Sequence, residues 1–271
     1  MKLIEWNIRG AAAFPCNNGY EIPKWVVDEV TNQEADCVVL TEFVVAKGWD
    51  YLQEQLERNE YNWFVSAFTG TNGILIALKK NEKYDFNEVF KYKDMEHTFK
   101  SSQIFGVTEV PDFAEVRFKV GKEDVSIIGV RIKKDIKKET PHYTIRQFIC
   151  LDDYLSSLKH KVICVGDFNA YWAGNWKKEE NYTLPKTAKS YDIYTPPYRG
   201  CEDWFSYVKS DGSKEIKMQL DHLITNCKAE NSSYDWSFIK ESNGYVAVDK
   251  FSHNKPVGLP DHAIFRVNID I

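Results

Sequence analysis

The sequence lacks the marks of several large classes of protein. None of its apolar runs approaches the roughly 18 to 20 residues that a membrane-spanning helix needs. Its six cysteines include no C-x-x-C pair, and Cys37 and Cys164 lie inside apolar runs, so we expect reduced thiols, although the even number would permit three disulfides. The first residues resemble a strand, with no basic start followed by an apolar run. No signal peptide is therefore visible, and we expect a cytoplasmic protein.

Motifs of common enzyme classes are missing as well. No two of the 14 glycines stand two or five positions apart, which removes the G-x-G-x-x-G and P-loop patterns, and neither G-x-S-x-G nor H-E-x-x-H occurs. Basic residues number 35 and acidic residues 40, for a formal charge of −5. This balance argues against a strongly basic nucleic-acid coat protein. It leaves open nucleic acid as a substrate held by a local basic patch and a metal.

The chain does contain many short apolar runs. At 43% hydrophobic and 28% charged residues it can bury a sizeable core, and with no linker or low-complexity tract we expect a single domain over residues 1–271. Runs rich in β-branched and aromatic residues predict strands at 3–8, 37–40, 63–67, 74–78, 113–120, 125–132, 162–165, 220–225 and 263–269.

Helices are expected to be fewer. Apolar residues at three-four spacing predict helices over 22–34, 49–58 and 141–158, the first with Pro23 at its first helical position. Residues 171–218 have weak periodicity and are expected to hold long loops. Many strands with a few helices between them favour a layered α/β or α+β domain.

The residues that carry chemistry follow the predicted strands. The apolar run 162–165 leads into Gly166-Asp167-Phe168-Asn169. If the chain stays extended, Asp167 and Asn169 point to one side, with Phe168 as an anchor on the other. The alternative for these two polar residues is a local Asx turn without function.

Other strands deliver similar groups. Asn7 follows the first strand and Glu42 the second, while Asp221-His222 lies inside one strand and Asp261-His262 precedes the last. Taken singly, each has a plain interpretation as a turn, a cap or a buried hydrogen bond. The whole set in this order is much harder to explain by chance.

In this order the motifs resemble the signatures of the endonuclease/exonuclease/phosphatase superfamily, which has the deoxyribonuclease I-like fold. The resemblance spans nearly the whole chain and rests on Trp6-Asn7-Ile8, Thr41-Glu42, Asn72-Gly73-Ile74, Gly166-Asp167-Phe168-Asn169, Leu220-Asp221-His222 and Pro260-Asp261-His262. It implies an α+β, four-layer αββα sandwich of two packed, mostly antiparallel sheets flanked by helices. It also implies hydrolysis of a phosphoester with a divalent metal, usually Mg²⁺, with Mn²⁺ as a substitute.

The resemblance assigns a metal set. Glu42 corresponds to the main metal carboxylate, and Asn7 and Asp261 to its neighbours, direct or through water. Asn7 and Asn72 are also expected to contact the substrate. Carboxylate and amide oxygens are hard ligands that suit Mg²⁺ or Mn²⁺, and such an ion would neutralise charge on the phosphoryl oxygens and leaving group.

The resemblance also assigns a reacting set. Asp167 corresponds to the group that orients or deprotonates the attacking water, and Asn169 to an amide donor for the phosphate. His262 corresponds to the histidine that contacts the scissile phosphate, with Asp221 orienting it and keeping it charged. His222 matches no catalytic position and is interpreted as structural.

One position departs from the pattern. The strand at 125–132 resembles the one that ends in a catalytic histidine or tyrosine, but here it carries Arg131. An arginine can clamp phosphate with two hydrogen bonds, yet it cannot act as a general acid near neutral pH. Three interpretations stay open: Arg131 binds phosphate in an active enzyme, which we favour; the alignment shifts within this strand; or the site is weakened and the protein mainly binds.

The flanking residues favour nucleic acid as the substrate. Lys133 and Lys134 follow Arg131 and could form a basic rim, although a solvated loop explains them equally well. Trp172 follows the Gly-Asp-Phe-Asn motif and could stack a base or simply pack in its loop. We therefore expect a nuclease. The alternatives are a phosphomonoesterase or phosphodiesterase for a small nucleotide or inositol phosphate, and a weakened binding module. A membrane substrate is not expected, and no protein partner can be inferred.

Overall fold

The computed structural model describes residues 1–8, 21–67, 73–81, 84–92, 110–134, 143–170, 191–197, 203–211, 214–238 and 261–271. Within these ranges only the backbone is described at 84–92, 143, 145, 209–211 and 214–216. Among the described residues no helix is long and apolar enough to cross a membrane. The four cysteines that fall within them are free thiols.

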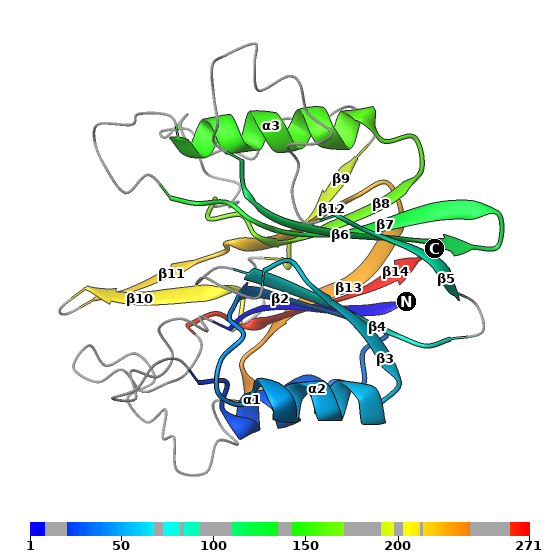
Figure 1. The fold of residues 1–271 in the computed structure, drawn as a ribbon. Helices are drawn as coiled ribbons and strands as arrows, with labels where there is room; N and C mark the ends of the chain where they lie inside the picture. Colours follow the sequence, from blue (N-terminus) through cyan, green and yellow to red (C-terminus); the bar gives the residue numbers. More distant parts are fainter. Residues whose placement is uncertain are drawn as a thin grey trace.

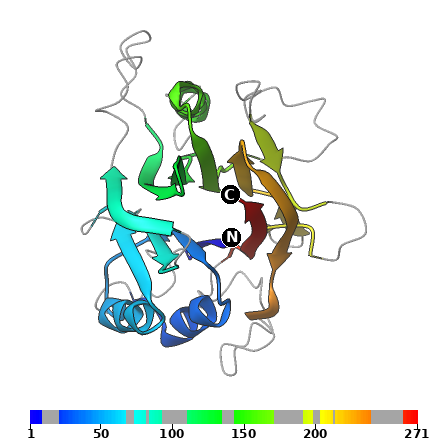
Figure 2. The same ribbon diagram turned by 90° about the vertical axis from the view of Figure 1, so that its right-hand side faces the viewer.

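The first sheet contains both ends of the chain. Its strand order is β13-β14-β1-β2-β4-β3, and only β1 and β2 run parallel. In chain order the strands are β1 (Lys2–Asn7), β2 (Cys37–Phe43), β3 (Tyr61–Val65), β4 (Gly73–Lys79), β13 (Lys228–Asp235) and β14 (Ile264–Asp270). The pairing of β1 with β14 places the termini side by side at one edge of the molecule (Figures 1 and 2).

The second sheet has the order β5-β6-β7-β8-β12-β9, and only β7 and β8 run parallel. Its strands are β5 (Tyr84–Tyr92), β6 (Asp112–Val120), β7 (Glu123–Arg131), β8 (Lys161–Asp167), β9 (Asp192–Tyr194) and β12 (Asp221–Thr225). A separate hairpin of β10 (Tyr207–Asp211) and β11 (Lys214–Met218) extends from one end of the sandwich (Figure 1).

The two sheets pack face to face, with helices on their outer faces (Figures 1 and 2). Helices α1 (Lys24–Asn32) and α2 (Trp49–Arg58) cover the first sheet, and α3 (Tyr143–Ser157) covers the second. This arrangement confirms the predicted four-layer α+β sandwich with mostly antiparallel sheets. Each sheet has one parallel pair at its centre, so the ends of β1, β2, β7 and β8 are brought to the same end of the sandwich.

Small and branched residues let the sheets approach closely. Val39, Ile74 and Ile76 from the first sheet face Gly129 of β7. A methyl group added at Gly129 would lie 2.6 Å from Ile74 Cγ2 and 3.0 Å from Val39 Cγ1, which is closer than packed carbons tolerate. A second apolar cluster joins α3 to the outer face of β8 and includes Phe148, Leu151, Leu155, Val162 and Cys164.

The predicted strands and helices are present, with ends shifted by a few residues. Pro23 is the N-cap of α1, not its first helical residue. The interpretation of 171–218 as long loops is wrong in part, because β9, β10 and β11 fall there. Strand β13 was also not predicted, since it is a sheet edge with few inward side chains (Ala229 and Tyr234 among them) and its sequence is mostly polar.

Candidate active site

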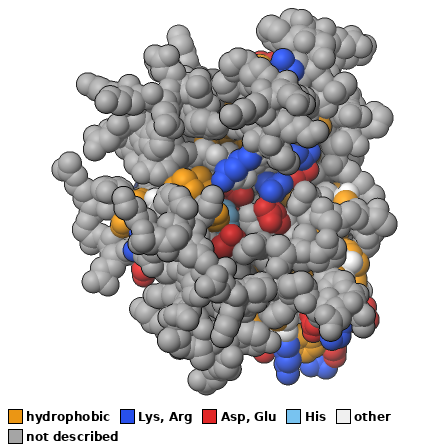
Figure 3. All heavy atoms as spheres, turned by 90° about the vertical axis from the view of Figure 1, so that its left-hand side faces the viewer, with side chains coloured by type: hydrophobic (Ala, Val, Ile, Leu, Met, Phe, Trp, Pro, Cys, Tyr) orange, Lys and Arg blue, Asp and Glu red, His pale blue; other side chains and the backbone are white. Residues whose placement is uncertain are grey.

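The predicted site residues gather where the two sheets meet. Asn7 ends β1, Arg131 and Asp167 end the parallel strands β7 and β8, Asp221 begins β12, and His262 lies two residues before β14. Parallel strands end at the same edge of a sheet, and an antiparallel neighbour begins there. Acidic and basic side chains accordingly surround a histidine on the face seen in Figure 3.

Asp167 is fixed by three hydrogen bonds. Asn7 Nδ2 donates to its Oδ2 at 3.0 Å, which ties the first sheet to the second. The backbone N–H of Asn169 donates to Oδ1 at 2.8 Å, and Asn169 Nδ2 donates to Oδ2 at 3.0 Å. Asp167 is buried, so a carboxylate with this many donors is held in one orientation.

Asn169 lies beside Asp167, but not for the predicted reason. The expectation of an extended chain is wrong here, since Asn169 has φ 47°, in the left-handed region, and the strand ends at Asp167. The backbone hydrogen bond from Asn169 to Asp167 makes the Asx turn that was the alternative interpretation. The turn still puts the amide against the carboxylate, and Phe168 lies buried on the other side near Phe148.

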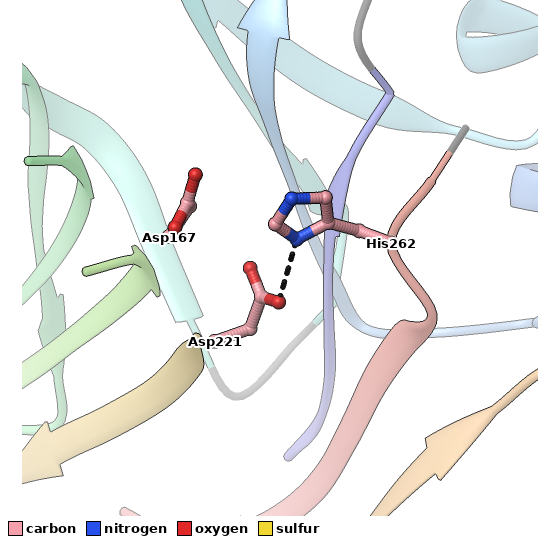
Figure 4. Close-up of side chains that lie close together, drawn as sticks. All are labelled: Asp167, Asp221 and His262. Carbon is pink, nitrogen blue, oxygen red and sulfur yellow. Dashed lines mark hydrogen bonds and ion pairs between the residues drawn. The ribbon is translucent and has the colours of Figure 1, made fainter. Parts of the chain in front are cut away.

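His262 forms a buried pair with Asp221. Its Nδ1 donates to Asp221 Oδ2 at 2.8 Å, and Trp6 Nε1 donates to the His262 backbone carbonyl at 3.0 Å. The other ring nitrogen has no hydrogen-bond partner among the described residues, and it lies on the side of the ring nearer Asp167 (Figure 4). The imidazole therefore presents one N–H toward the space beside Asp167.

Electrostatics keep this histidine charged. Burial opposes the charge, but the carboxylates of Asp221, Asp167 and Asp261 outweigh it and raise the pKa of His262 to about 10. Burial also raises the pKa of Asp167, which the charge of His262 partly counteracts. A raised carboxylate pKa favours proton acceptance near neutral pH, and a charged imidazole favours binding of a phosphoryl oxygen.

A third buried carboxyl, Glu5, lies next to the site and was missed by the sequence analysis. Glu5 is fully buried on β1, and Thr41 Oγ1 donates to its Oε1 at 2.8 Å. Burial raises its pKa well above the usual value, and the neighbouring Asp221 adds to the effect. The signal was present in the sequence. Residues two apart on a strand share a face, so Glu5 had to point the same way as Asn7.

Arg131 is ion-paired with the predicted metal carboxylate. Its Nε and NH2 atoms lie 2.8 and 2.7 Å from Glu42 Oε1. Its NH1 atom lies 3.2 Å from Asp112 Oδ2, and Lys133 Nζ lies 2.9 Å from Asp112 Oδ1. Asp112 was not predicted from the sequence. Lys133 is thus tied to Asp112 in place of standing free on a basic rim.

An aromatic residue of the hairpin lies against the histidine. The ring of Tyr207 is 4.9 Å from that of His262, and Lys134 Nζ is 5.3 Å from the centre of the Tyr207 ring. Tyr207 begins β10 and forms an isolated β-bridge with His262. The sequence analysis missed it because it assigned this region to loops. A cation, an aromatic ring and the histidine therefore lie in contact at one side of the site, with the two rings tilted by 53°.

The structure describes two further residues from the sequence analysis, His222 and Asp261. His222 points away from the site, with its Nε2 2.9 Å from the Ala170 carbonyl and its Nδ1 2.8 Å from Thr195 Oγ1. Asp261 is beside His262 and contributes to its raised pKa. Asn72 and Trp172 lie outside the described residues.

The carboxylates and the imidazole at the site are groups of the kinds that can bind a divalent cation. One ligand atom each from Asp167, Asp221 and His262 lie within 4.8 Å of one another (Figure 4). Asp221 Oδ1 is buried and has no hydrogen-bond partner among the residues that the structure describes, which is a costly state that a cation or a proton would relieve. His262 is a weaker candidate ligand because its ring is protonated. Glu42 gives its Oε1 to Arg131, so a metal on this carboxylate would have the guanidinium as a close neighbour.

Comparison with solved structures finds the same fold along the whole chain. TDP2 of D. rerio, in complex with a single-strand DNA product, matches with a TM-score of 0.64 at 10% identity, over 100% of this chain and 99% of that one. The Bacteroides thetaiotaomicron VPI-5482 mannosyl-6-phosphatase matches at 0.61 and 12%, over 100% of both chains. An AP endonuclease from Archaeoglobus fulgidus matches at 0.55 and 13%, again over 100% of both.

No protein-family model and no curated protein matches the sequence. The likeness to known proteins therefore lies in the fold. The fold implied by the sequence motifs is confirmed: the chain has the deoxyribonuclease I-like fold that these three structures share.

Proposed function

We propose that this protein is a metal-dependent hydrolase of phosphoric esters that cleaves phosphodiester bonds in nucleic acid. The observation that carries the proposal is the convergence of Asp167 and His262, from two different sheets, on one space beside the Asp221 carboxylate. A buried acceptor for a water proton and a buried cation for a phosphoryl oxygen are the two groups that this reaction needs.

Asp167 is proposed to take the proton of the attacking water. Asn7 and Asn169 hold its carboxylate from two sides, so the lone pair that faces the substrate does not have to be ordered during the reaction. Burial favours a pKa above the usual value for this group, which improves it as a base. Asn169 is already bonded to the carbonyl of Ile132 at 2.7 Å. It therefore positions Asp167 first and reaches the phosphate only by giving up one of these bonds.

His262 is proposed to bind a non-bridging oxygen of the phosphate. Asp221 accepts a hydrogen bond from the Nδ1–H of His262. This bond fixes the ring and leaves the second ring nitrogen directed at the substrate space. A charged donor in a buried site stabilises the negative charge that grows on the phosphoryl oxygens. Arg131 is proposed to add a second cationic contact to the same group.

Glu42, Asn7 and Asp261 are proposed to hold the divalent metal, with Mg²⁺ favoured and Mn²⁺ as a substitute. In the cluster of Asp167, Asp221 and His262, Asp167 is instead proposed as the base, and the protonated histidine is held by Asp221. When bound, the ion supplies charge neutralisation at the phosphoryl and leaving oxygens. Few protein ligands are needed, because Mg²⁺ keeps several of its own waters.

Nucleic acid is the proposed substrate because the Tyr207 ring and Lys134 lie beside His262. A base next to the scissile phosphate could lie on Tyr207, and Lys134 is close enough to meet a neighbouring phosphate. Asn72, Lys133 and Trp172 stay predicted substrate contacts, and a cytoplasmic location stays a prediction. Two of the structures with this fold are a TDP2 with a DNA product and an AP endonuclease, while another is a sugar phosphatase, so the substrate must be tested directly.

The test is a cleavage assay with labelled single- and double-stranded DNA and RNA, a generic phosphodiester and a phosphomonoester. Each is offered with Mg²⁺, Mn²⁺ or a chelator, to the wild type and to Asp167→Asn. Cleavage of a nucleic acid that needs both metal and Asp167 is the expected result. Exclusive turnover of the phosphomonoester would replace the nuclease proposal by a phosphatase. Binding without turnover of any ester would leave a weakened binding module.

A further inference from the structure

Arg131 binds the carboxylate that the metal would need. Two nitrogens of its guanidinium lie within 2.8 Å of a single oxygen, Glu42 Oε1. Both side chains are mostly buried, with exposed fractions of 17% and 18%. An ion pair shielded in this way is screened less by water and salt than a surface pair.

Two further charged residues, Asp112 and Lys133, extend this ion pair into a network with equal numbers of positive and negative groups. Arg131 also contacts Asp112, and Asp112 contacts Lys133, so two cations and two carboxylates alternate along the edge of the site. Within this network a divalent ion at Glu42 would add two positive charges next to a guanidinium. Like charges at such short range repel each other, and the repulsion is larger for a divalent ion than for a monovalent one.

A phosphate offers Arg131 another partner. Arg131 and Asp167 are directly opposite each other in the β7–β8 register, so the guanidinium begins beside the proposed phosphate position. The planar guanidinium matches two oxygens of a phosphate as well as it matches a carboxylate. Movement of the side chain from Glu42 to a phosphate would free Oε1 and take the guanidinium charge away from the metal position.

We propose that the guanidinium of Arg131 hinders metal binding at Glu42 when no phosphate is bound. A bound phosphate would draw the guanidinium away from Glu42 and so allow the metal to bind. Metal and phosphate then bind with positive coupling, because each favours the state in which the guanidinium has left Glu42. This inference rests on the proposed function and adds its regulation: the metal is held tightly only when a phosphate group is present.

The experiment measures the affinity for Mn²⁺ from the electron paramagnetic resonance signal of the free ion, without turnover. The wild type, Arg131→Gln and Lys133→Gln are titrated at equal ionic strength with either chloride or sulfate, a phosphate-like oxyanion. Lys133→Gln is the matched control, because it removes a cation of the same network that does not touch Glu42. Circular dichroism and thermal melting of each variant check that it is folded.

In chloride, Arg131→Gln is expected to bind Mn²⁺ roughly tenfold more tightly than the wild type, equal to about 1.4 kcal/mol, and Lys133→Gln within about twofold. Sulfate should tighten Mn²⁺ binding by the wild type several-fold and leave Arg131→Gln unchanged. Equal or weaker binding by Arg131→Gln, or wild-type affinity that sulfate does not change, would overturn the proposal. The sulfate effect is measured on the wild type alone. It therefore tests the proposed coupling of metal and phosphate binding even if Arg131→Gln does not fold.

The outcome is separable from that of the proposed function. If no ester is hydrolysed but Mn²⁺ binding follows the expected pattern, the hydrolase proposal fails and the competition at Glu42 stands. If esters are hydrolysed and every variant binds Mn²⁺ alike with and without sulfate, the hydrolase stands and the competition fails.

Discussion

His262 Nδ1 lies 2.8 Å from Asp221 Oδ2 across the junction of the two sheets, although 41 residues separate them in the chain. Together with the hydrogen bond from Asn7 to Asp167, this contact joins the first sheet to the second at the site itself. The geometry of the site therefore depends on how the sheets pack. A variant that loosens the packing between β1 and β8 will disturb the site without touching it.

The His262–Asp221 pair makes stability fall as the pH rises. The pKa of His262 is about 10 in the folded protein, above its unfolded value near 6.5. The stabilisation is thus fully present below pH 6.5 and is lost as the pH rises through 10. Asp221→Asn should lower the pKa of His262, and its cost in unfolding free energy should be largest near pH 6 and shrink toward pH 10.

Two measurements check this pair. NMR titration of the His262 ring protons reports its pKa, and urea unfolding from pH 6 to 10 reports the stability of the wild type and of Asp221→Asn. The neighbouring histidine His222 serves as an internal reference in the NMR spectra, since it does not contact Asp221 through its ring. An unchanged pKa of His262 in Asp221→Asn would show that other charges hold the proton.

Asp167 should be the most sensitive single position for the reaction. Asp167→Asn keeps the size of the side chain but removes the base, so the rate should fall by roughly 10²- to 10⁴-fold. Asn7→Ala removes only one of the donors that hold the carboxylate and should cost less. Single-turnover rates with saturating metal test the order of the two variants. A larger loss for Asn7→Ala would mean that Asn7 acts through the metal or substrate more than through Asp167.

The strand ends were predictable because they combine two local signals. An apolar run followed by Asp167 or Glu42 marks a buried strand and a polar terminus, and a parallel pair places such termini together. The order of motifs then supplied the fold. By contrast, the contact of Tyr207 with His262 depends on a hairpin of polar composition, in which no periodic pattern marks the strands.

Pairings between side chains could not be read from the sequence. Arg131 looked like a free phosphate ligand, yet it is bound to Glu42, because the ends of β2 and β7 meet across the sheet interface. Asp112 lay one residue before a predicted strand, 113–120, and carried no motif. Its role follows from its register, since β6 pairs Asp112 directly with Arg131. Distances of this kind come from tertiary packing and leave no mark on a single sequence.

The position of the Tyr207 ring beside His262 predicts that Tyr207→Ala affects oligonucleotides more than a small phosphodiester. Tyr207→Ala removes the aromatic face beside His262, and loss of base stacking typically costs about 1–3 kcal/mol per base, or roughly 5- to 150-fold in binding. The variant should weaken oligonucleotide binding or cleavage by this amount and change the hydrolysis of a small phosphodiester much less. Parallel kinetics on an oligonucleotide and a small ester, with Tyr207→Phe as the control that keeps the ring, measure it. Equal losses on both substrates would place Tyr207 in support of His262 instead.

Acid stability should depend on His222, with the opposite sign to His262. Burial lowers the pKa of His222 to about 4, from an unfolded value near 6.5, and the hydrogen bond to the Ala170 carbonyl offsets only part of this effect. The unfolded chain therefore binds more protons between these values, so stability is lost as the pH falls from 6.5 and the loss is complete below 4. A shift of this size corresponds to about 3 kcal/mol.

His222→Gln should be less stable than the wild type at pH 7 but should lose much less stability between pH 6.5 and 4. Urea unfolding across that range tests it against His160→Gln, a half-buried histidine whose pKa is also lowered and whose replacement should flatten the curve less. Parallel curves for the wild type and His222→Gln would show that His222 does not set the acid limit.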